Sequence, residues 1–411
     1  MKHRSLEWQL LVLVSLALTA FGLVMVYSAT SASAALGNGN PTGYLERQGI
    51  YALLGFAALV IAARTDFRKL RALAPPLVVT ALVLCTAVLA IGPRVNGARR
   101  WIGLGPATFQ PSELAKLALV VWAAAYYARR PAPRTLKDIA RPVGLLVGLF
   151  CLLILVEPDL GTAITIVVMI GAVLLVSGTP LPTLTAAYLI VGGVGGIAAW
   201  TSPYRRARLF TFLDPWKDPL GAGLQNVQAQ ISIGSGGIFG RGLGQGIEKI
   251  HYLPEAHTDM IFAVIGEELG LVGAAVLVAG YSAFAYAGLR LAIGCKDPFG
   301  KRLAAGITAL VCGQAAINLA AVLGLAPLTG IPLPFVSYGG SSLVVTLLGV
   351  GILLNIARGH AATQRASVPD SGGRDGRASR PVARRGGSPA RARGGGDVRR
   401  VAGSRRGAAR S

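Results

Sequence analysis

The sequence predicts an all-α membrane protein, a polytopic bundle of about ten transmembrane helices. Two observations lead to this class. Hydrophobic residues make up 53% of the 411-residue chain and charged residues only 14%, whereas soluble globular domains carry roughly 25% charged residues. Apolar stretches long enough to cross a bilayer also recur along the chain, separated by short polar connections. Together these features exclude an ordinary soluble enzyme.

Each expected span is an apolar stretch between charged or turn-forming residues. The first follows a short basic start, Lys2 to Arg4, and no cleavage site follows it, which indicates a retained helix rather than a signal peptide. The fifth and sixth are separated only by Glu157, Pro158 and Asp159, where the proline ends one helix and Asp159 can cap the next. The ten ranges are 9–29, 46–64, 73–92, 111–128, 142–157, 160–178, 183–201, 260–291, 303–325 and 339–357.

The orientation of the bundle follows from where Lys and Arg lie in the connections. Basic residues gather at the N-terminus, in the loops near 64–71, 129–141 and 290–302, and in the C-terminal tail. The alternate loops at 30–45 and 326–338 contain neither Lys nor Arg. Because basic loops stay on the cytoplasmic side, both termini are expected to be cytoplasmic.

Two outer loops nevertheless carry positive charge. The loop at 93–110 contains Arg94, Arg99 and Arg100, and the long extracytoplasmic loop at about 202–258, between the seventh and eighth helices, contains six Lys or Arg residues. Positive charge in a short outer loop opposes its insertion across the membrane. The charge therefore indicates that these loops bind an anionic ligand, such as a lipid pyrophosphate. The alternative is solvated charge or contact with anionic headgroups.

The long outer loop has local order of its own. Asp214-Pro215 and Asp218-Pro219 are turn signals, and residues 225–233 fit a short amphipathic helix. The stretch 234–246 is rich in glycine, which suits tight turns or close backbone approach. It lacks the strand–helix context and the Lys-Ser/Thr ending of a phosphate-binding loop, so a structural use is favoured.

The sequence divides into a membrane domain over 1–358 and a basic tail over 359–411. The tail consists mainly of Arg, Gly, Ser, Ala and Pro, which predicts disorder on the cytoplasmic side. Its charge would attract anionic lipid, and without an aromatic platform no nucleic acid partner is expected. The four cysteines lack metal-ligand spacing and predict neither a metal site nor a disulfide framework.

Acidic and polar side chains crowd the stretch 249–270, where the long outer loop meets the eighth helix. Glu255, His257 and Asp259 lie at one membrane face, with Thr258 between them, which is typical of an acid/base site. The alternative is that Thr258 or Asp259 only caps the helix that begins at Met260.

Further charged residues lie near the outer ends of the expected helices. Glu113 and Lys116 are three residues apart at the start of the fourth span, so they share a helix face. They either face a ligand or hold the bundle together as an ion pair. Glu267 and Glu268 follow about two turns into the eighth span, where carboxylates are costly and need a reason.

Eight strings occur in order along the chain and span nearly the whole expected bundle. They are VNGARRWIGLG (95–105), QPSELAKL (110–117), EPDLGTA (157–163), DPWKDPLGAG (214–223), GSGGIFGRGLG (234–244), YLPEAHTD (252–259), FAVIGEELG (262–270) and PFVSYGGSS (334–342). In this order they resemble the SEDS family (shape, elongation, division and sporulation). The YLPEAHTD and DPW segments resemble the cell-division branch more closely than the rod-elongation branch.

This resemblance implies a peptidoglycan glycosyltransferase that polymerises lipid II at the outer face of the cytoplasmic membrane, during septal cell-wall synthesis. In the family the aspartate of the HTD string is catalytic, which is Asp259 here. As general base it would deprotonate the 4-hydroxyl of the acceptor GlcNAc, which attacks C1 of the donor MurNAc as undecaprenyl pyrophosphate leaves. The outward arginines and Lys116 would stabilise that pyrophosphate. The candidate substrate-binding residues are Arg99, Arg100, Glu113, Lys116, Glu157, Asp159, Glu255, His257, Thr258 and Ser337.

The implied partners are lipid II, undecaprenyl pyrophosphate, membrane lipid, a class B penicillin-binding transpeptidase and other divisome proteins at the septum. No cofactor is implied, and a divalent cation is left open. Two alternatives remain. One is a lipid II flippase, for which Glu267 and Glu268 would mark a polar path. The other is a divisome scaffold without chemistry of its own. Within the family, the rod-elongation polymerase is the runner-up.

Overall fold

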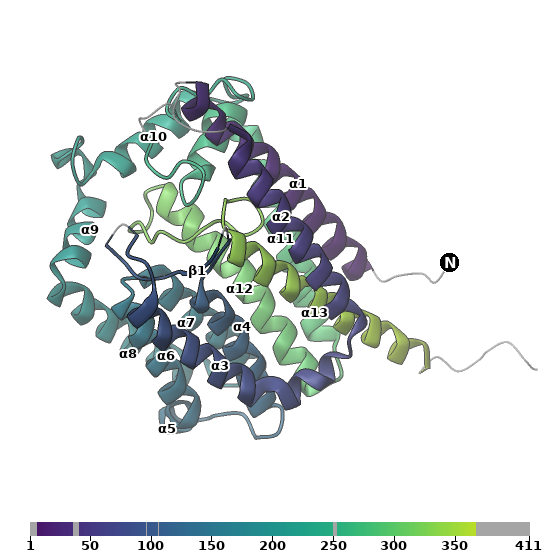
Figure 1. Ribbon diagram of the computed structural model, residues 1–411. Coiled ribbons are helices and arrows are strands. Elements are labelled where there is room, and N and C mark those ends of the chain that lie inside the picture. The colour runs from purple at the N-terminus through teal and green to yellow at the C-terminus, as the bar shows by residue number, and fades with distance from the viewer. Residues whose placement is uncertain (1–5, 36–40, 96, 106, 250–252, 367–411) are drawn as a thin grey trace, which may run out of the picture. The chain divides into compact units, whose positions relative to one another are not determined.

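The chain folds around a bundle of long helices, seen in a computed structural model that describes residues 6–35, 41–95, 97–105, 107–249 and 253–366. These described residues form one compact unit (Figure 1). The elements are α1 (Leu6–Ala35), α2 (Pro41–Arg64), η1 (Phe67–Lys69), α3 (Leu70–Ile91), β1 (Ile102–Leu104), β2 (Ala107–Phe109), α4 (Pro111–Tyr127), α5 (Leu136–Ile139), the π-helical turn η2 (Ala140–Gly144), α6 (Leu145–Val156), α7 (Leu160–Val176), α8 (Leu181–Thr201), α9 (Pro203–Leu213), η3 (Pro215–Lys217), α10 (Leu224–Gly236), α11 (Ile261–Gly294), α12 (Pro298–Val322) and α13 (Gly340–Ala366).

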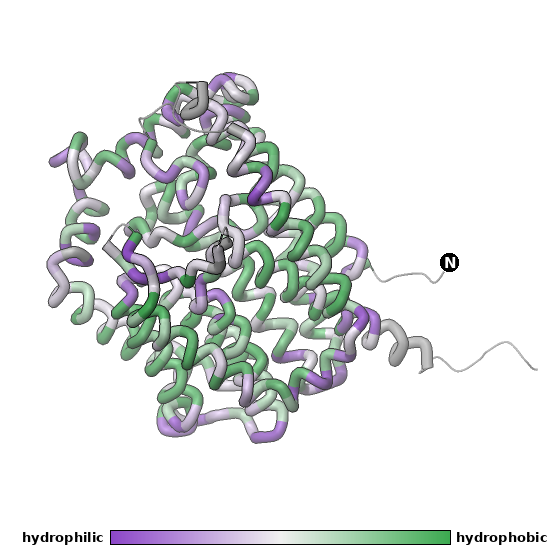
Figure 2. The backbone as a smooth tube through the Cα atoms, in the orientation of Figure 1, coloured by the Kyte–Doolittle hydropathy of each residue, from purple (hydrophilic) through white to green (hydrophobic). Residues whose placement is uncertain are grey.

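Every expected span corresponds to a helix. Eight helical stretches among the described residues are long and apolar enough to cross a membrane. The other two expected spans are α4 and α7, each of 17 residues. Figure 2 shows apolar residues along the bundle helices and hydrophilic residues gathered at their ends and in the loops. The prediction of a polytopic membrane helix bundle is confirmed.

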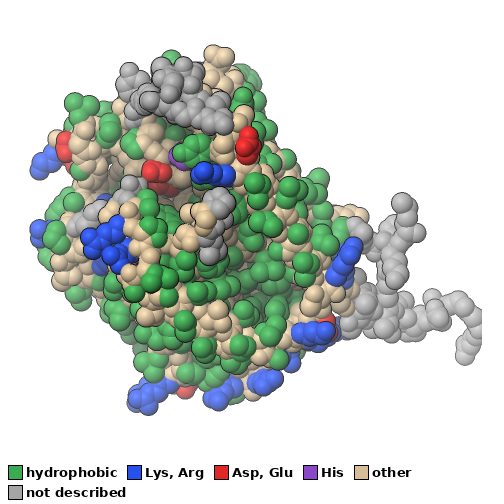
Figure 3. Space-filling model, in the orientation of Figure 1, with side chains coloured by type: hydrophobic (Ala, Val, Ile, Leu, Met, Phe, Trp, Pro, Cys, Tyr) green, Lys and Arg blue, Asp and Glu red, His purple; other side chains and the backbone are tan. Residues whose placement is uncertain are grey.

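The short helix α4 lies at the centre of the bundle. α4 is buried along nearly its whole length and packs against α3, α7 and α12, while α13 packs against α2. α8 lies at the edge, where nearly all its side chains are at least partly exposed. Figure 3 shows Lys and Arg side chains along the lower edge of the view, at the end of the bundle away from α9 and α10. The opposite end, which carries residues 202–260 and 326–338, is called the loop end below.

One small departure from an all-helical fold lies between α3 and α4. Strands β1 and β2 pair antiparallel, with Ile102 opposite Phe109. The backbone N–H of Thr108 donates to the Tyr51 hydroxyl of α2 over 2.9 Å, which fixes this hairpin against the bundle. The hairpin was not predicted because it is only three residues long on each side.

The eighth expected span, 260–291, is not one continuous helix. Gly270 interrupts α11 with φ 65° and ψ −161°, a conformation open to glycine but not to residues with a side chain. The backbone N–H groups of Leu271 and Val272, freed by this break, donate to the carbonyls of Gly237 and Ile238. The glycine-rich stretch 234–246 therefore has the structural use that was favoured, because it supplies partners to an interrupted membrane helix.

This break separates Glu267 and Glu268 from most of α11. The part of α11 after it, Leu271–Gly294, is about 36 Å long at 1.5 Å per residue, enough to cross a hydrocarbon core of about 30 Å by itself. The two glutamates precede that part, but α11 as a whole, Ile261–Gly294, also has the length and apolarity of a span. Their expected place inside the span stays a prediction.

The long loop contains more helix than the sequence predicted. α10 confirms the expected helix over 225–233 and extends it at both ends. α9, which carries Arg205, Arg206 and Arg208, was not expected, since its arginines hide the apolar pattern. At the other end of the chain α13 continues to Ala366, eight residues beyond the expected boundary at 358. Residues 367–411 lie outside the described residues, so the disorder of the tail stays a prediction.

Candidate active site

The residues before α11 form a compact turn at the loop end. The backbone N–H groups of Thr258 and Met260 both donate to the carbonyl of Glu255, over 3.1 and 3.3 Å. Met260 is the residue that precedes the first turn of α11, and no side chain caps this helix. The alternative that Thr258 or Asp259 caps α11 is therefore wrong.

The Asp259 carboxylate has few partners for a partly buried charge. Its Oδ1 accepts a 3.3 Å hydrogen bond from the Thr258 hydroxyl, which also donates to Glu255 Oε2 over 2.9 Å. Its Oδ2 lies beside Gly330, 3.9 Å from where a β-carbon of that residue would stand. Burial, followed by the negative charge of Glu255, raises the pKa of Asp259 to about 6, against the lowering effects of its own backbone N–H, of Thr258 and of Arg208. Such a carboxylate is mostly ionised at pH 7 and ready to accept a proton.

His257 is held by aromatic rings next to this carboxylate. Its ring lies 4.8 Å from that of Tyr44 and 5.6 Å from that of Tyr338, measured between centroids. The Tyr338 backbone N–H donates to the His257 carbonyl over 2.9 Å. Burial lowers the pKa of His257, only partly opposed by Glu255, so the imidazole is neutral at pH 7. Figure 3 shows acidic, basic and histidine side chains close together on this part of the surface.

The loop at 326–338 connects the scattered polar residues to the Asp259 turn. From α12, the Asn318 amide donates to the carbonyls of Asp259 and Ile331 over 2.8 and 2.9 Å. One turn earlier, the Gln314 amide donates to the carbonyl of Pro332 over 2.8 Å. From α9, Arg208 donates to the carbonyl of Leu328 over 3.1 Å. Two separate helices, α9 and α12, thus fix the position of this loop beside the carboxylate.

Gln314 and Asn318 were missed by the sequence reasoning. They are polar amides four residues apart inside an apolar span, so they share one helix face. Polar side chains in a membrane helix usually have a specific partner. That spacing was the signal which could have found them.

Glu113 and Lys116 form the ion pair that was one of the two expected outcomes. Lys116 Nζ lies 2.8 Å from Glu113 Oε1 and 2.6 Å from Gln314 Oε1, and both charged side chains are almost fully buried. Because Gln314 also donates to the carbonyl of Pro332, this pair is linked through Gln314 to the 326–338 loop beside Asp259. Its predicted contact with substrate stays a prediction.

Asp159 and Glu157 lie at the reversal between α6 and α7, as expected. Their carboxyl groups differ in hydrogen bonding. Asp159 caps α7 by accepting from the Thr162 backbone N–H over 3.0 Å and from its hydroxyl over 2.8 Å. Glu157 is 1% exposed, and neither carboxyl oxygen has a hydrogen-bond partner among the described residues. Burial, followed by the charge of Asp159, raises the pKa of Glu157 to about 8, against the lowering effect of Arg100. Glu157 is thus mostly a neutral acid at pH 7.

Arg99 and Arg100 of the 93–110 loop were predicted to bind pyrophosphate. In the structure their guanidinium groups donate to backbone carbonyls at helix ends. Arg99 donates to the carbonyls of Leu89 and Ala90 at the end of α3. Arg100 donates to the carbonyls of Glu157 and Pro158. Guanidinium groups there satisfy carbonyls that a helix end leaves free, so contact with pyrophosphate stays a prediction for both.

Ser337 also has a structural partner. Its hydroxyl accepts from the Leu333 backbone N–H over 2.8 Å, and its carbonyl accepts from the Gln48 amide over 3.1 Å. Ser337 therefore stabilises the conformation of the 326–338 loop, to which it belongs. Its direct role in substrate binding stays a prediction.

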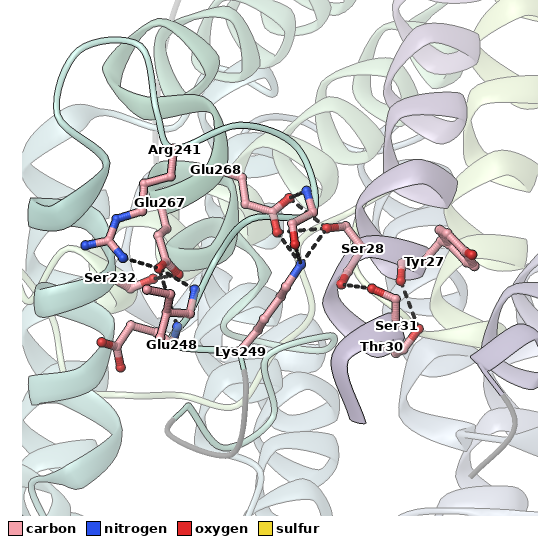
Figure 4. A network of polar contacts seen from close by, with 12 residues as sticks. Tyr27, Ser28, Thr30, Ser31, Ser232, Arg241, Glu248, Lys249, Glu267 and Glu268 are labelled. Carbon is pink, nitrogen blue, oxygen red and sulfur yellow. Dashed lines mark hydrogen bonds and ion pairs between the residues drawn. The ribbon is translucent and has the colours of Figure 1, made fainter. Parts of the chain in front are cut away.

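Glu267 and Glu268 belong to a separate, closely paired network (Figure 4). Lys249 Nζ lies 2.6 Å from Glu268 Oε1, and the Ser28 hydroxyl of α1 lies 2.8 and 2.7 Å from the two oxygens of the same carboxylate. Glu267 Oε1 accepts from the backbone N–H of Ile247 over 2.7 Å. Both glutamates are fully buried. They fix the stretch 244–249 that leads into the Asp259 turn.

Metal binding was left open by the sequence. No group of three or more His, Cys, Asp or Glu side chains suited to a metal ion occurs in the part of the chain that the structure describes. A divalent cation stays an untested prediction.

Together these features define a multi-pass membrane protein with a candidate acid/base site at one end of its helix bundle. The chain belongs to the cell cycle protein family FTSW_RODA_SPOVE, whose model matches residues 8–362. This confirms the resemblance seen in the sequence, since the family is the one predicted from the eight strings.

Named relatives and solved structures agree with the family. The chain is 42% identical over 352 residues to the "Probable peptidoglycan glycosyltransferase FtsW" of Geobacter sulfurreducens, covering 84% of this chain and 94% of the relative. It is 38% identical to the "Stage V sporulation protein E" of Bacillus subtilis, covering 85% and 96%. A chain from a peptidoglycan synthase complex that coordinates polymerization and crosslinking matches with TM-score 0.73 and 33% identity, covering 88% and 99%. The rod shape determining protein RodA of Thermus thermophilus matches with TM-score 0.63 and 31% identity, covering 85% and 96%.

Proposed function

We propose that this protein is a peptidoglycan glycosyltransferase that polymerises lipid II into glycan strands. The observation that carries the chemistry is the Asp259 carboxylate, which is partly buried, accepts a single 3.3 Å side-chain hydrogen bond, and has a pKa raised to about 6. Relatives at about 40% identity over more than four-fifths of the chain are named as peptidoglycan glycosyltransferases. The family and the carboxylate support the same activity from independent directions.

In the proposed reaction Asp259 is the general base. It takes the proton from the 4-hydroxyl of the acceptor GlcNAc while that oxygen forms a bond to C1 of the donor MurNAc. The C1–oxygen bond to undecaprenyl pyrophosphate breaks, and the pyrophosphate leaves with the bonding electron pair. Thr258 holds the carboxylate by its hydrogen bond, and Asn318 fixes the backbone at Asp259.

Positive charge for the leaving pyrophosphate has one well-placed source among the outward arginines that the sequence pointed to. Arg208 is close enough to Asp259 to lower the pKa of that carboxyl group, and α9 places it at the loop end. Arg208, Lys116, Arg99 and Arg100 all have protein partners, so a role for any of them in binding the pyrophosphate requires those contacts to be exchanged. A planar guanidinium can bind a phosphate through two parallel hydrogen bonds.

The flippase alternative loses its main support. Glu267 and Glu268, the two acids expected inside a span, precede the membrane-length part of α11 and are engaged by Lys249 and backbone N–H groups. A scaffold without chemistry does not explain why a carboxylate with a raised pKa lies at the loop end. Both alternatives are outcomes of the experiment below.

The setting of this activity is also proposed. The site faces outward across the cytoplasmic membrane, since the loops at the other end carry the basic residues that stay inside. Likeness to a chain of a peptidoglycan synthase complex supports a class B penicillin-binding transpeptidase as partner. Cell division, with other divisome proteins at the septum, is favoured over elongation because several relatives above 40% identity are named FtsW.

The test is polymerisation of labelled lipid II by the purified protein with its transpeptidase partner in detergent micelles. Micelles have no second leaflet, so strand formation there cannot come from flipping. Strands resolved on a gel, made without any other polymerase, are the expected result. No strands from a folded complex, together with lipid II transfer across liposome membranes, would favour the flippase. Failure in both assays would favour the scaffold. A parallel arm with a chelator tests the divalent cation.

A further inference from the structure

A second feature of the loop end is a cavity between α9 and α10. Its volume is about 290 Å³, and it is lined by Ala207, Arg208, Thr211, Ala222, Gln225, Asn226 and Leu328. Small-molecule sites in proteins usually range from about 300 to 1,000 Å³, so this cavity has room for about one sugar ring or a smaller group.

The cavity adjoins the Asp259 site. Arg208 lines it and donates to the carbonyl of Leu328, which lines it as well. Leu328 lies two residues before Gly330, the residue beside Asp259 Oδ2. A substrate with its reacting sugar at Asp259 therefore has a neighbouring part within reach of the cavity.

One lining residue has an unmet need for a hydrogen-bond donor. Asn226 is 7% exposed, and its Oδ1 has no hydrogen-bond partner among the described residues. A buried amide oxygen without a partner is costly, commonly by about 1–3 kcal/mol. Because Oδ1 can only accept, a phosphate oxygen cannot satisfy it at neutral pH, whereas an N–H group can.

The rest of the lining suits the other parts of an acetamido group. Thr211 and Gln225 can donate to a carbonyl oxygen. Ala207, Ala222 and Leu328 offer apolar wall of the kind that a methyl group prefers. We propose that this cavity is a subsite for an N-acetyl group of a lipid-linked sugar, with Asn226 Oδ1 accepting from its N–H. This inference rests on the proposed function, since both sugars of lipid II are N-acetylated.

The test combines a protein change with a substrate change. Asn226→Leu keeps the volume and removes the acceptor, and lipid II with its GlcNAc or MurNAc N-deacetylated removes the acetamido group. Each change alone should raise KM for polymerisation about tenfold and alter kcat less than twofold, since binding and not the proton transfer is affected. When Asn226→Leu is assayed with lipid II deacetylated at the sugar that occupies the cavity, KM should again be about tenfold above that of the wild type with natural lipid II. The effects do not multiply, because both changes remove the same contact.

Gln228→Leu is the matched control, an amide on the same helix that does not line the cavity. It should leave KM unchanged. Asn226→Asp, which keeps an acceptor oxygen at the same position, should keep KM closer to wild type than the Leu variant does. If Asn226→Leu does not fold, the substrate arm still decides with the wild-type protein and the Asp variant.

Equal KM for natural and N-deacetylated lipid II of both kinds would overturn the subsite, and so would fully independent effects of the two changes. Either result leaves the glycosyltransferase proposal intact, because that proposal fails only if the wild-type complex makes no strands from natural lipid II. The two failures are therefore distinguishable in one set of assays.

Discussion

Two groups of carboxylates lie at opposite ends of the same short helical segment, Ile261–Leu269, and their surroundings differ. In its last turn, Glu267 and Glu268 are fully buried and engaged by Lys249, Ser28 and backbone N–H groups. Before it, Asp259 accepts one long hydrogen bond from a hydroxyl and lies near a second negative charge, Glu255. The Glu267 and Glu268 carboxylates have several close partners each, whereas the Asp259 carboxylate has one side-chain donor.

The number of partners of a carboxylate distinguishes a structural role from a catalytic role better than the extent of its burial does. A buried charge that has its full set of partners is unavailable to a substrate, because every contact to the substrate would replace one already made. A carboxylate short of partners has a raised pKa and a free oxygen, which is what proton transfer requires. Glu267 and Glu268 also hold the stretch 244–249, which leads towards Asp259.

Removing one partner of the Glu268 carboxylate should have the largest effect on stability. Lys249→Met leaves the Glu268 carboxylate buried without its cation, which typically costs about 3–5 kcal/mol. We expect a clearly lower unfolding temperature for the purified protein in detergent, followed by intrinsic fluorescence. The exposed pair of Arg290 and Glu7, 4.0 Å apart, is the matched control, and Arg290→Met should cost less than about 1 kcal/mol.

A second variant makes this prediction sharper. Replacing both partners, Lys249→Met with Glu268→Leu, should recover much of the lost stability, because no unpaired charge is left. A single Lys249→Met variant as stable as the wild type would show that the pair is not what holds the loop.

The pH dependence of polymerisation tests the Asp259 carboxylate. A general base works only when deprotonated, and burial raises the pKa of Asp259 to about 6. The value of kcat/KM should therefore rise about tenfold per pH unit up to roughly pH 6 and level off above it. A rate independent of pH between 4.5 and 7, on a protein that stays folded, would contradict this assignment.

A smaller effect is expected from Thr258→Val. The hydroxyl of Thr258 donates to Asp259 and lowers the pKa of that carboxyl group. Its removal should move the acidic inflection of the pH–rate profile upward and slow polymerisation at pH 7 by less than tenfold. Thr258→Ser keeps the hydroxyl and serves as control. An inflection that moves downward, or equally in both variants, would show that Thr258 does not act through this hydrogen bond.

The smallest effect is expected from the tail. Deleting residues 367–411 removes a segment that is rich in arginine and glycine and poor in large apolar residues, so it cannot complete a core. Strand formation in vitro should stay at the wild-type level. A well-folded truncated protein that makes fewer strands would give the tail a role in the reaction.

Much of the fold was predictable because membrane helices can be recognised in a sequence as long apolar stretches. All ten ranges correspond to helices, and the reversal at Glu157 to Asp159 was placed correctly from a proline and a capping residue. The break at Gly270 was not predictable in the same way. Its cost is met by the carbonyls of Gly237 and Ile238, which lie more than thirty residues earlier in the chain.

The candidate site was predictable only where it is local in sequence. Glu255, His257, Thr258 and Asp259 are neighbours in the chain, and a motif could point to them. Gln314, Asn318 and Arg208 reach the same loop from two other helices, and only the fold shows that convergence. Arg99 and Arg100 show the reverse, since outward charge in the sequence turned out to bind helix carbonyls.

The most direct test of the central assignment is Asp259→Asn, assayed by gel-resolved polymerisation of labelled lipid II with the reconstituted partner. The amide keeps the size and polarity of the side chain and removes only the ionisable group. The variant should be at least as stable as the wild type, because a partly buried charge is gone, and should still bind its partner. Its rate should fall about 10²- to 10⁴-fold, the usual contribution of a general base. Glycan strands at close to the wild-type level would contradict the assignment of Asp259.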